Sequence, residues 1–558
     1  MPQTSTTCHR RAAVAILYAM PSTTEPPLIL PRQFLRMCRR NRQRLKVADS
    51  MGAMLTGGDL LLRTLILRRI LLRDVLAADE RNVGLLLPPS AGAVVANAAL
   101  PLMGRVAVNL NYTLSPALVN NCIRQCGIRH VLTSRRFMDR VKIDVAAELV
   151  YLEDFAGRMT LTDKLVAAIQ SRLLPMATLE RSFGLADIKP DDLLTIIFTS
   201  GSTGDPKGVM LTHENVGSNL GAIDQAIRLS IDDVAIGVLP FFHSYGYTAA
   251  LWTVLSLDPT GVYHFTPLDA HQVGKLCREQ KVTVFMATPT FLRTYLKRCE
   301  PQDFATLDVV FGAAEKVPRE LFDSFEAKYG IRPVEAYGCT ELSPLVAVNV
   351  PPSRSPRGDQ SGVREGTVGR PIPGVSVKVV NPETWQEMPK GEPGMLLVSG
   401  PNVMKGYLNQ PEATARVIRD GWYITGDLAT IDADGFITIT GRESRFSKMG
   451  GEMVPHGTIE EALQKILGGD EDHLQAVVTA VPDPRRGERL VVLHLPTSKT
   501  PEQIGQALAA AGLPNLWIPS PDSFMEVKEI PVLGTGKLDL KGMREAALKR
   551  FGKLPARN

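Results

Sequence analysis

Between about residues 31 and 345, short runs of β-branched and other apolar residues alternate with stretches of helical periodicity. Such runs occupy residues 193–199, 282–287 and 307–311. Parallel strands need long crossover connections, which are usually helices, and those helices cover the faces of the sheet. The alternation therefore predicts an α/β fold with parallel sheets between layers of helices.

The pattern changes after a loop at residues 351–366 that is rich in Pro, Ser, Arg and Gly. Short apolar segments at 391–400 and 436–441 then lie between Gly and Pro turns, which predicts a small antiparallel β-barrel. The final segment combines an amphipathic helix at 458–467 with apolar runs at 476–481 and 490–495. This combination predicts a small α+β domain.

We expect three parts in the chain. Residues 1–30 lack periodicity and are rich in Ser, Thr and Pro, so we expect a flexible leader there. Residues 31–441 are expected to form one large domain. Residues 442–558 are expected to form the C-terminal domain, with the boundary near 441–448.

Two apolar segments have the length of targeting or membrane segments. Residues 12–20 follow two arginines as in a short signal peptide, but no small-x-small cleavage site follows cleanly. The uncharged stretch 83–104 could span a bilayer, but its prolines predict a strand, a turn and a buried helix instead. The seven cysteines have scattered spacings that fit no disulfide framework or zinc site. We therefore predict a cytoplasmic protein without a transmembrane segment.

Charge excludes one class of partner and leaves another open. The net charge of +5 over 558 residues is too small to predict nucleic-acid binding. Positive charge is concentrated among apolar residues at 32–46, either as the solvated face of a helix or as a surface that docks to anionic lipid or an acidic protein. The basic residues there are Arg32, Arg36, Arg39, Arg40, Arg42, Arg44 and Lys46.

The strand at 193–199 leads directly into a segment of hydroxyl groups, glycines and one lysine. Backbone N–H and side-chain O–H groups in such a segment can surround an anion, and the lysine adds a point charge. The Walker A motif is not satisfied, and a flexible turn is the alternative interpretation. The candidate phosphate-binding residues are Thr199, Ser200, Gly201, Ser202, Thr203, Gly204 and Lys207.

Further motifs follow this loop at residues 240–246, 312–315, 337–341, 366–370, 400–407, 423–427, 441–442, 481–488 and 531–537. In this order they resemble the adenylate-forming superfamily of acyl-CoA synthetases, peptide-synthetase adenylation domains and luciferases. The resemblance covers residues 31–545. It implies a large domain of two α/β subdomains plus a small β-barrel, followed by a small, mobile α+β C-terminal domain.

A narrower resemblance rests on residues 242–246, 314–316, 400–404, 451–454 and 533–537. These segments are similar to the synthetase half of the bifunctional 2-acylglycerophosphoethanolamine acyltransferase/acyl-carrier-protein synthetases. The resemblance implies ATP-dependent activation of a fatty acid to acyl-AMP, release of pyrophosphate, and transfer to the phosphopantetheine thiol of acyl-carrier protein. The alternative is a long-chain fatty acid–CoA ligase, which differs only in the thiol.

The resemblance also implies the cofactors ATP and Mg²⁺ and a role for each motif. The loop at 199–207 holds the β- and γ-phosphates, Thr340 donates to the α-phosphate, and Glu341 holds Mg²⁺. Lys537 reaches the carboxylate and the α-phosphate from the C-terminal domain. The implied contacts to adenine and ribose are Tyr337, Gly338, Asp427 and Arg442.

The acyl end of the site is implied by two other motifs. His243 lies beside the acyl entrance in the family, and a core histidine is the alternative interpretation. Gly312, Ala313 and Ala314, followed by Glu315, have almost no side chains where the family places the floor of the acyl pocket. A long chain can pass there, which favours a fatty acid over a small acid.

Two positions depart from the family pattern. The hinge residue, usually Asp or Lys, is Ser444, which can still absorb a backbone rotation. Where many CoA ligases have a polar pattern with an arginine, this chain has Gly451-Glu-Met453. The missing cation weakens the expectation that CoA is the acceptor. Arg485 and Arg486, or the cluster at 32–46, could instead attract an acidic carrier protein.

Two alternative functions are disfavoured. Lysophospholipid acyltransfer has the signature His-x₄-Asp, which occurs once, at His264 and Asp269, between a strand and a helix of the adenylating domain. We interpret it as accidental, because short patterns are permissive. A non-catalytic nucleotide or acyl binder is disfavoured by the retained Glu341, Asp427 and Lys537.

Overall fold

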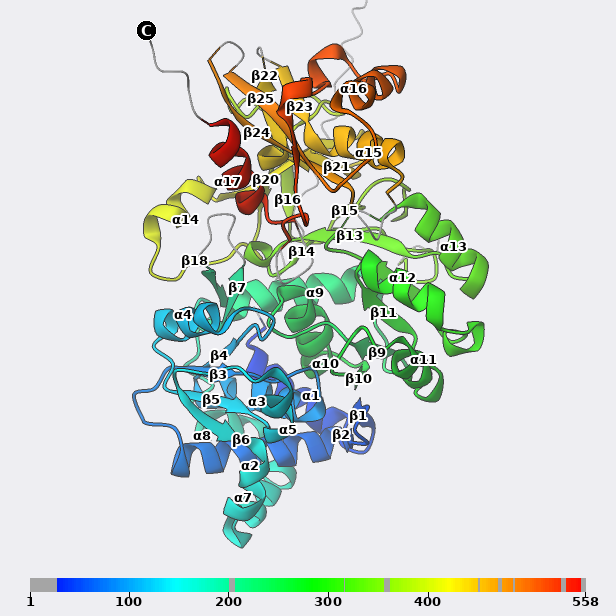
Figure 1. Ribbon diagram of the computed structural model, residues 1–558. Coiled ribbons are helices and arrows are strands. Elements are labelled where there is room, and N and C mark those ends of the chain that lie inside the picture. Colours follow the sequence, from blue (N-terminus) through cyan, green and yellow to red (C-terminus); the bar gives the residue numbers. More distant parts are fainter. Residues whose placement is uncertain are drawn as a thin grey trace, which may run out of the picture.

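The computed structural model describes residues 28–199, 206–315, 317–355, 362–449, 452–469, 474–484, 487–532 and 538–552. Within these residues the chain forms four β-sheets, two large and two small. The large sheets and their helices occupy the lower and middle part of Figure 1, and the last part of the chain lies at the top.

The first large sheet has seven strands and carries the phosphate-loop segment. Its inner pairs are parallel, whereas β8 and β18 are added antiparallel next to β7. In spatial order the strands are β18 (Gly406–Tyr407), β8 (Lys207–Thr212), β7 (Leu193–Thr199), β4 (Val106–Asn109), β3 (Asn82–Leu85), β5 (His130–Thr133) and β6 (Glu148–Tyr151).

The second large sheet has nine strands, parallel from β13 through β1 and antiparallel at both edges. Its order is β15 (Arg370–Pro371), β14 (Leu345–Val348), β13 (Val334–Gly338), β12 (Val309–Gly312), β11 (Val284–Ala287), β9 (Val234–Gly237), β10 (Thr260–Tyr263), β1 (Leu45–Asp49) and β2 (Met54–Thr56).

Helices pack on the large sheets as the alternating pattern predicts, and α7 packs on the helix α2 (Figure 1). The helices of this part of the chain are α1 (Leu30–Arg40), α2 (Gly57–Asp74), α3 (Ala91–Ala99), α4 (Pro116–Cys126), α5 (Arg135–Val141), α6 (Phe155–Arg158), α7 (Leu161–Arg172), α8 (Met176–Ser182), α9 (His213–Ile227), α10 (Thr253–Ser256), α11 (Ala270–Glu279), α12 (Pro289–Arg298) and α13 (Arg319–Tyr329).

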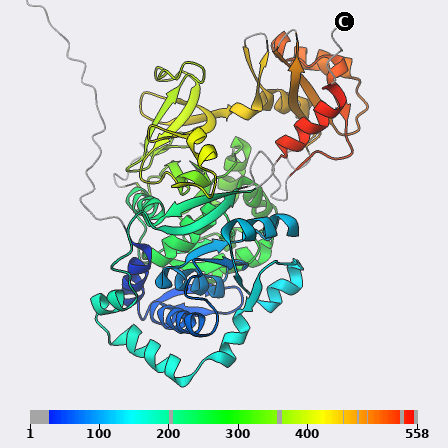
Figure 2. The ribbon, with the colours of Figure 1, turned by 90° about the vertical axis from the view of Figure 1, so that its left-hand side faces the viewer.

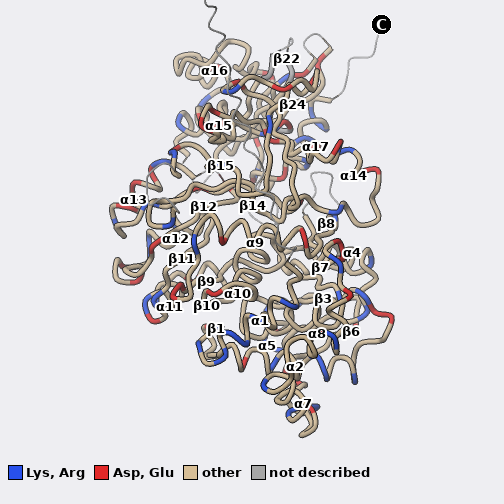
Figure 3. The backbone as a smooth tube through the Cα atoms, turned by 180° about the vertical axis from the view of Figure 1, so that it is seen from behind, with Lys and Arg blue, Asp and Glu red and all other residues tan. Residues whose placement is uncertain are grey.

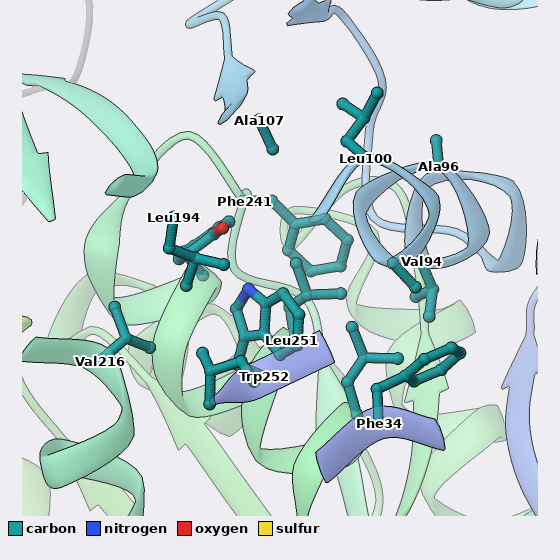
Figure 4. Close-up of a cluster of buried hydrophobic side chains, with 14 of the residues drawn as sticks. Phe34, Val94, Ala96, Leu100, Ala107, Leu194, Val216, Phe241, Leu251 and Trp252 are labelled. Carbon is teal, nitrogen blue, oxygen red and sulfur yellow. The ribbon is translucent and has the colours of Figure 1, made fainter. Parts of the chain in front are cut away.

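A continuous apolar core joins elements that are distant in sequence. Figure 4 shows Trp252 and Phe241 between Phe34 of α1, Val94 of α3 and Val216 of α9. All five side chains are buried. Burial of large apolar side chains is the main favourable term in folding, so this cluster fixes the two large sheets relative to each other.

The two small sheets follow later in the chain. The third sheet is antiparallel, with β16 (Ser376–Val380) and β19 (Ile418–Arg419) at its ends, β17 (Gly394–Ser399) and β20 (Trp422–Ile431) between them, and β21 (Ile437–Arg442) paired to β20; α14 (Pro411–Val417) lies beside it. The fourth sheet comprises β22 (Phe446–Met449), β23 (Glu452–Pro455), β24 (Ala476–Asp483), β25 (Gly487–His494) and β26 (Phe524–Glu526), with α15 (His456–Leu467), α16 (Pro501–Ala510) and α17 (Leu540–Phe551). In Figure 2 this last sheet and its helices stand apart from the larger part of the chain.

The expected α/β fold, with a large N-terminal and a smaller C-terminal domain, is confirmed. The stretch 83–104 forms a strand and a buried helix, as its prolines predict. No helix in the described ranges has the length and apolar character needed to cross a membrane. Leu30, the last residue of the expected leader, is fully buried and is the first residue of α1. This residue therefore belongs to the packed part of the chain.

Candidate active site

Polar side chains from three sheets converge at the end of β13 and the short 3₁₀ helix η5 (Thr340–Leu342) that follows it. The second sheet supplies Tyr337, the third supplies Asp427 and Arg442, and the first supplies Lys207 and Tyr407. Such a meeting of strand ends and loops is the usual place for a ligand in an open α/β fold.

The phosphate-loop segment begins and ends on adjacent strands. Thr199 is the last residue of β7 and is paired with Lys207, the first residue of β8. The two ends of the intervening segment are therefore adjacent at the edge of the site. Its residues Ser200, Gly201, Ser202, Thr203 and Gly204 lie outside the described part of the chain.

Glu341 is held by a tyrosine that also contacts the loop lysine. The Tyr407 hydroxyl donates to Oε1 of Glu341 at 2.9 Å, and Lys207 Nζ lies 5.1 Å from the centre of the Tyr407 ring. Burial, and then the negative charge of Glu341, raises the pKa of Tyr407, so the phenol remains a donor. Tyr407 thus contacts both the loop lysine on β8 and Glu341 on η5.

Asp427 is buried and accepts from two donors. Its Oδ2 accepts from the Tyr337 hydroxyl at 2.5 Å, and its Oδ1 lies 2.7 Å from Nε of Arg442, which faces it across β20 and β21. Burial, followed by the Asp427 charge, raises the pKa of Tyr337 well above its usual value. The Asp427 charge raises the pKa of Arg442. The carboxylate is thus fixed in position with lone pairs to spare for a ligand.

The turn that carries Thr340 and Glu341 requires a glycine. A Cβ on Gly338 would lie 1.9 Å from the carbonyl oxygen of Pro344, which already accepts from the Cys339 N–H at 3.0 Å. Thr340 is fixed from another motif, because the Ser244 hydroxyl donates to its Oγ1 at 3.2 Å. The turn is therefore rigid where the two polar side chains leave it.

The expected acyl-floor residues follow β12 in one short segment. Gly312 ends the strand, Ala313 is buried with its N–H on the carbonyl of Ala287, and Ala314 has a positive φ of 75°. Glu315 is exposed and accepts from the Thr290 hydroxyl at 3.0 Å, so it points away from the core. His243 is also exposed, and its ring packs 4.5 Å from that of Phe242.

Other residues named from the sequence do not contribute to the site as described. Lys537, Gly451, Arg485 and Arg486 lie outside the described residues. His264 and Asp269 lie 3.7 Å apart between Nε2 and Oδ2, but each also has a structural partner. Buried His264 is hydrogen-bonded through Nδ1 to Ser50, and Asp269 caps α11.

Two site residues were not assigned from the sequence, although both lie in the quoted motifs. Tyr407 ends the motif at 400–407 and positions Glu341, and Ser244 lies in the motif at 240–246 and positions Thr340. Their position within the motifs was the available signal. Their partners, however, are 66 and 96 residues away in the chain, and no local pattern identifies them.

Comparison with known proteins agrees with this arrangement. A family model described as AMP-binding enzyme matches residues 34–408. A long-chain-fatty-acid–CoA ligase of Bacillus subtilis is 32% identical over 357 residues, 62% of this chain and 60% of that protein. A feruloyl-CoA synthase of an Amycolatopsis species is 32% identical over 368 residues, 65% and 70% of the two chains. Thus the match spans less than two thirds of the Bacillus ligase.

Among solved structures, ATP-bound MatB from Rhodopseudomonas palustris superimposes with a TM-score of 0.75 and 27% identity, covering 94% of this chain and 100% of that one. The relatives' names agree with the expectation of an AMP-forming acid–thiol ligase and give CoA, not a carrier protein, as the thiol. The family model covers more than half of the chain and includes the loop at 199–207, Thr340 and Glu341. The chain therefore belongs to the AMP-binding enzymes.

Proposed function

We propose that this chain joins a carboxylic acid to AMP at the expense of ATP and then transfers the acyl group to the thiol of CoA. The observation that carries the proposal is the convergence of Lys207, Glu341 and Thr340 with the Tyr337–Asp427–Arg442 group. The first set has the charges and donors for a triphosphate. The second has a buried carboxylate that can accept from two ribose hydroxyls.

In the first step, a carboxylate oxygen of the acid attacks the α-phosphorus, and the bond from this phosphorus to pyrophosphate breaks. The acid and the triphosphate repel each other, so the site must neutralise charge and align the displacement. Lys207 and the loop at 199–207 attract the leaving pyrophosphate, and Thr340 donates to the α-phosphate. Asp427 and Arg442 fix the ribose, while Tyr337 lies beneath the base.

A magnesium ion fits the donor set at Glu341. Mg²⁺ is usually held by one or two carboxylates together with substrate phosphates, and no cluster of three metal-ligating side chains occurs among the described residues. Glu341 offers a carboxylate whose Oε1 is oriented by Tyr407. When bound there, Mg²⁺ would neutralise phosphate charge.

In the second step, the thiol sulfur attacks the acyl carbonyl of the adenylate, and AMP leaves with the bonding electron pair. We propose that Lys537 stabilises charge during the first step and that His243 borders the acyl path. The departure at Gly451-Glu-Met453 favours a carrier protein, but the relatives named for CoA have the greater weight. For the acid, the small residues at 312–314 and the Bacillus relative support a long-chain fatty acid.

The decisive experiment is ATP–pyrophosphate exchange with acids of graded chain length, followed by acyl transfer to CoA or to holo-acyl-carrier protein. We expect exchange with long-chain acids and transfer to CoA. Transfer to the carrier protein alone would reverse the choice of acceptor. A failure of exchange with every acid tested would refute adenylation.

A lysine variant separates an enzyme from a nucleotide binder. Lys537→Ala should abolish exchange while ATP binding, measured by calorimetry, remains. The control Lys541→Ala removes an exposed lysine on α17 that pairs with Glu545, and it should leave exchange unchanged.

A further inference from the structure

Helix α7 has its apolar residues on the outside. Asp163, Ala167 and Ser171, spaced by four residues, are buried against the rest of the protein. On the opposite face Leu161, Leu165, Ile169 and Leu173, also spaced by four, are 83%, 63%, 38% and 75% exposed. A surface helix of a globular protein normally has the reverse arrangement. We call these four residues the α7 apolar stripe.

The inner face of α7 is held by charge, which explains why the stripe is not needed for packing. The buried Asp163 carboxylate forms ion pairs with Nε of Arg69 at 3.1 Å and with Nη1 of Arg73 at 2.6 Å, both on α2. The same carboxylate completes the capping box with Thr160. The helix is thus anchored in one orientation, and the stripe is fixed toward solvent.

The basic cluster at 32–46 separates into two groups in the structure. Most of its members are used internally: Arg32 and Arg36 pair with Glu180, Arg40 pairs with Asp258, Arg44 pairs with Asp232, and Lys46 donates to two buried carbonyl groups. Arg39 and Arg42 have no acidic partner among the described residues. The cluster is therefore only in part a solvated helix face.

Arg39 and Arg42 line a pocket of about 170 Å³ that α7 closes on one side with Ser171 and Arg172. Nη2 of Arg39 donates to the Gln170 carbonyl at 2.9 Å, whereas its Nε is buried without a partner in the described part of the chain. The one acidic side chain on the pocket wall, Asp59, accepts from Thr56. Three guanidinium groups therefore line a space at the C-terminal end of α7, where Arg172 directly precedes Leu173 of the stripe.

This surface lies at one end of the molecule. Figures 1 and 3 show α7 at the bottom, at the opposite end from the fourth sheet and α16. An object bound at this end leaves the fourth sheet and its helices uncovered. Docking there is compatible with the mobility that the family resemblance implies for the C-terminal domain.

We infer that the α7 apolar stripe and the pocket of Arg39, Arg42 and Arg172 dock the protein to the surface of an anionic phospholipid bilayer. An apolar helix face inserts among acyl chains at the headgroup boundary, and neighbouring cations bind headgroup phosphates. Three arginines and one carboxylate that is already hydrogen-bonded give the pocket the positive charge that a headgroup phosphate requires. The exposed Lys164, on α7 itself, adds a further cation beside the stripe. This complementarity favours a lipid surface over a protein partner, whose interface core is depleted of charge.

The test is flotation of the full-length protein with vesicles of phosphatidylcholine alone or with about one quarter phosphatidylglycerol. We expect the wild-type protein to float with the anionic vesicles and to remain largely unbound with the neutral ones. The triple variant L161Q/L165Q/L173Q should lower the partition coefficient by on the order of 10-fold or more. Glutamine keeps helix propensity, so α7 should remain folded.

Two further variants give the matched comparison. R42Q/R172Q should weaken binding to anionic vesicles and remove most of its salt dependence. M54Q/L268Q changes two similarly exposed apolar residues elsewhere and should float like the wild type. Circular dichroism of every variant reports folding independently of the proposed enzymatic activity.

Three outcomes would overturn the inference. The first is a wild-type protein that stays unbound with both vesicles. The second is a triple variant that floats as well as the wild type. The third is a wild-type dimer, seen by light scattering without lipid, that becomes monomeric in the triple variant, because the stripe then belongs to a second copy of the chain.

Discussion

Tyr337 and Asp427 are 90 residues apart in the chain, yet the tyrosine hydroxyl donates a 2.5 Å hydrogen bond to Oδ2 of the aspartate. The bond connects β13 of the nine-stranded sheet with β20 of the third sheet. With Arg442 on the other oxygen, the carboxylate is oriented before any ligand arrives. The ribose of the proposed substrate would need only to add donors to the remaining lone pairs, so we expect binding to require little rearrangement.

Replacing Asp427 with asparagine should therefore damage nucleotide binding more than the fold. The amide of the new side chain would keep an acceptor for Tyr337 but lose the charge that pairs with Arg442. We expect kcat/KM for ATP to fall about 100-fold in ATP–pyrophosphate exchange, with the unfolding midpoint little changed. The control D434N removes an exposed ion pair with Arg364 and should have less than about a two-fold effect. Equal activity of D427N and wild type would contradict the ribose assignment.

Glu341→Gln tests the metal assignment. Glutamine retains an oxygen for the Tyr407 hydroxyl, so the local structure is preserved, but the negative charge is lost. We expect kcat of the exchange reaction to fall on the order of 10²–10³-fold and the Mg²⁺ concentration for half-maximal rate to rise. Tyr407→Phe removes only the orienting donor and should give a smaller loss. An unchanged Mg²⁺ dependence in E341Q would exclude Glu341 as ligand.

Ala313→Leu tests the acyl pocket. Ala313 is buried in a cluster with Leu239, Ala249 and Phe311. We expect the acyl chain to bind beside it, so a larger side chain at this position would occupy part of the acyl pocket. The variant should lose exchange with long-chain acids by about 10-fold or more and retain it with short ones. Ala313→Gly should keep long-chain activity. A uniform loss over all chain lengths in A313L would place the pocket elsewhere.

Gly338→Ala should destabilise the protein, because the added Cβ would lie 1.9 Å from the Pro344 carbonyl oxygen. Relieving this clash requires a backbone shift, which costs free energy. We expect a loss of about 3 kcal/mol in the free energy of unfolding, measured in urea. The same change at Gly221, in the middle of α9 with no atom within 4 Å, should stabilise by about 0.5–1 kcal/mol. Similar effects at both positions would refute the steric argument.

His213 predicts a pH dependence of stability. Burial lowers its pKa from 6.5 to about 4, so the folded protein holds the imidazole neutral. Between these two values the unfolded chain binds a proton that the folded chain does not, and stability falls as the pH decreases from 6.5 toward 4. The resulting loss is about 2 kcal/mol at about pH 5.

The measurement is urea unfolding at about pH 7 and about pH 5, on either side of the unfolded-state pKa. In His213→Gln the difference between the two pH values should shrink by that amount, whereas His271→Gln, at an exposed position on α11, should reproduce the wild-type difference. An unchanged difference in H213Q would show that another group causes the pH effect.

The sequence predicted the strands of the large sheets well because their signal is local. A β-branched run between turns, as at 193–199, identifies a buried strand without knowledge of its neighbours. The same holds for the expected helix at 458–467, whose apolar positions repeat with helical spacing. In the structure this helix begins at His456, two residues before the expected start. The family motifs added the residues around Thr340 and Asp427.

What could not be predicted depends on partners distant in the chain. The charges of the cluster at 32–46 indicate a basic surface, whereas its pairing with Glu180 and Asp258 depends on the fold. The leucines of α7 would be assigned to the core by their spacing. They are exposed because Asp163 forms ion pairs with Arg69 and Arg73 on α2, and these ion pairs orient the Asp163 face of the helix inward.

Arg442 is at once the last residue of β21 and the partner of Asp427, and the chain enters the fourth sheet four residues later, at Phe446. We expect a rotation about the bonds after Arg442 to reorient the fourth sheet and to leave the Arg442–Asp427 pair, our proposed sugar contact, in place. Substitutions around Ser444 would then change the rate of the proposed reaction without changing the affinity for the nucleotide.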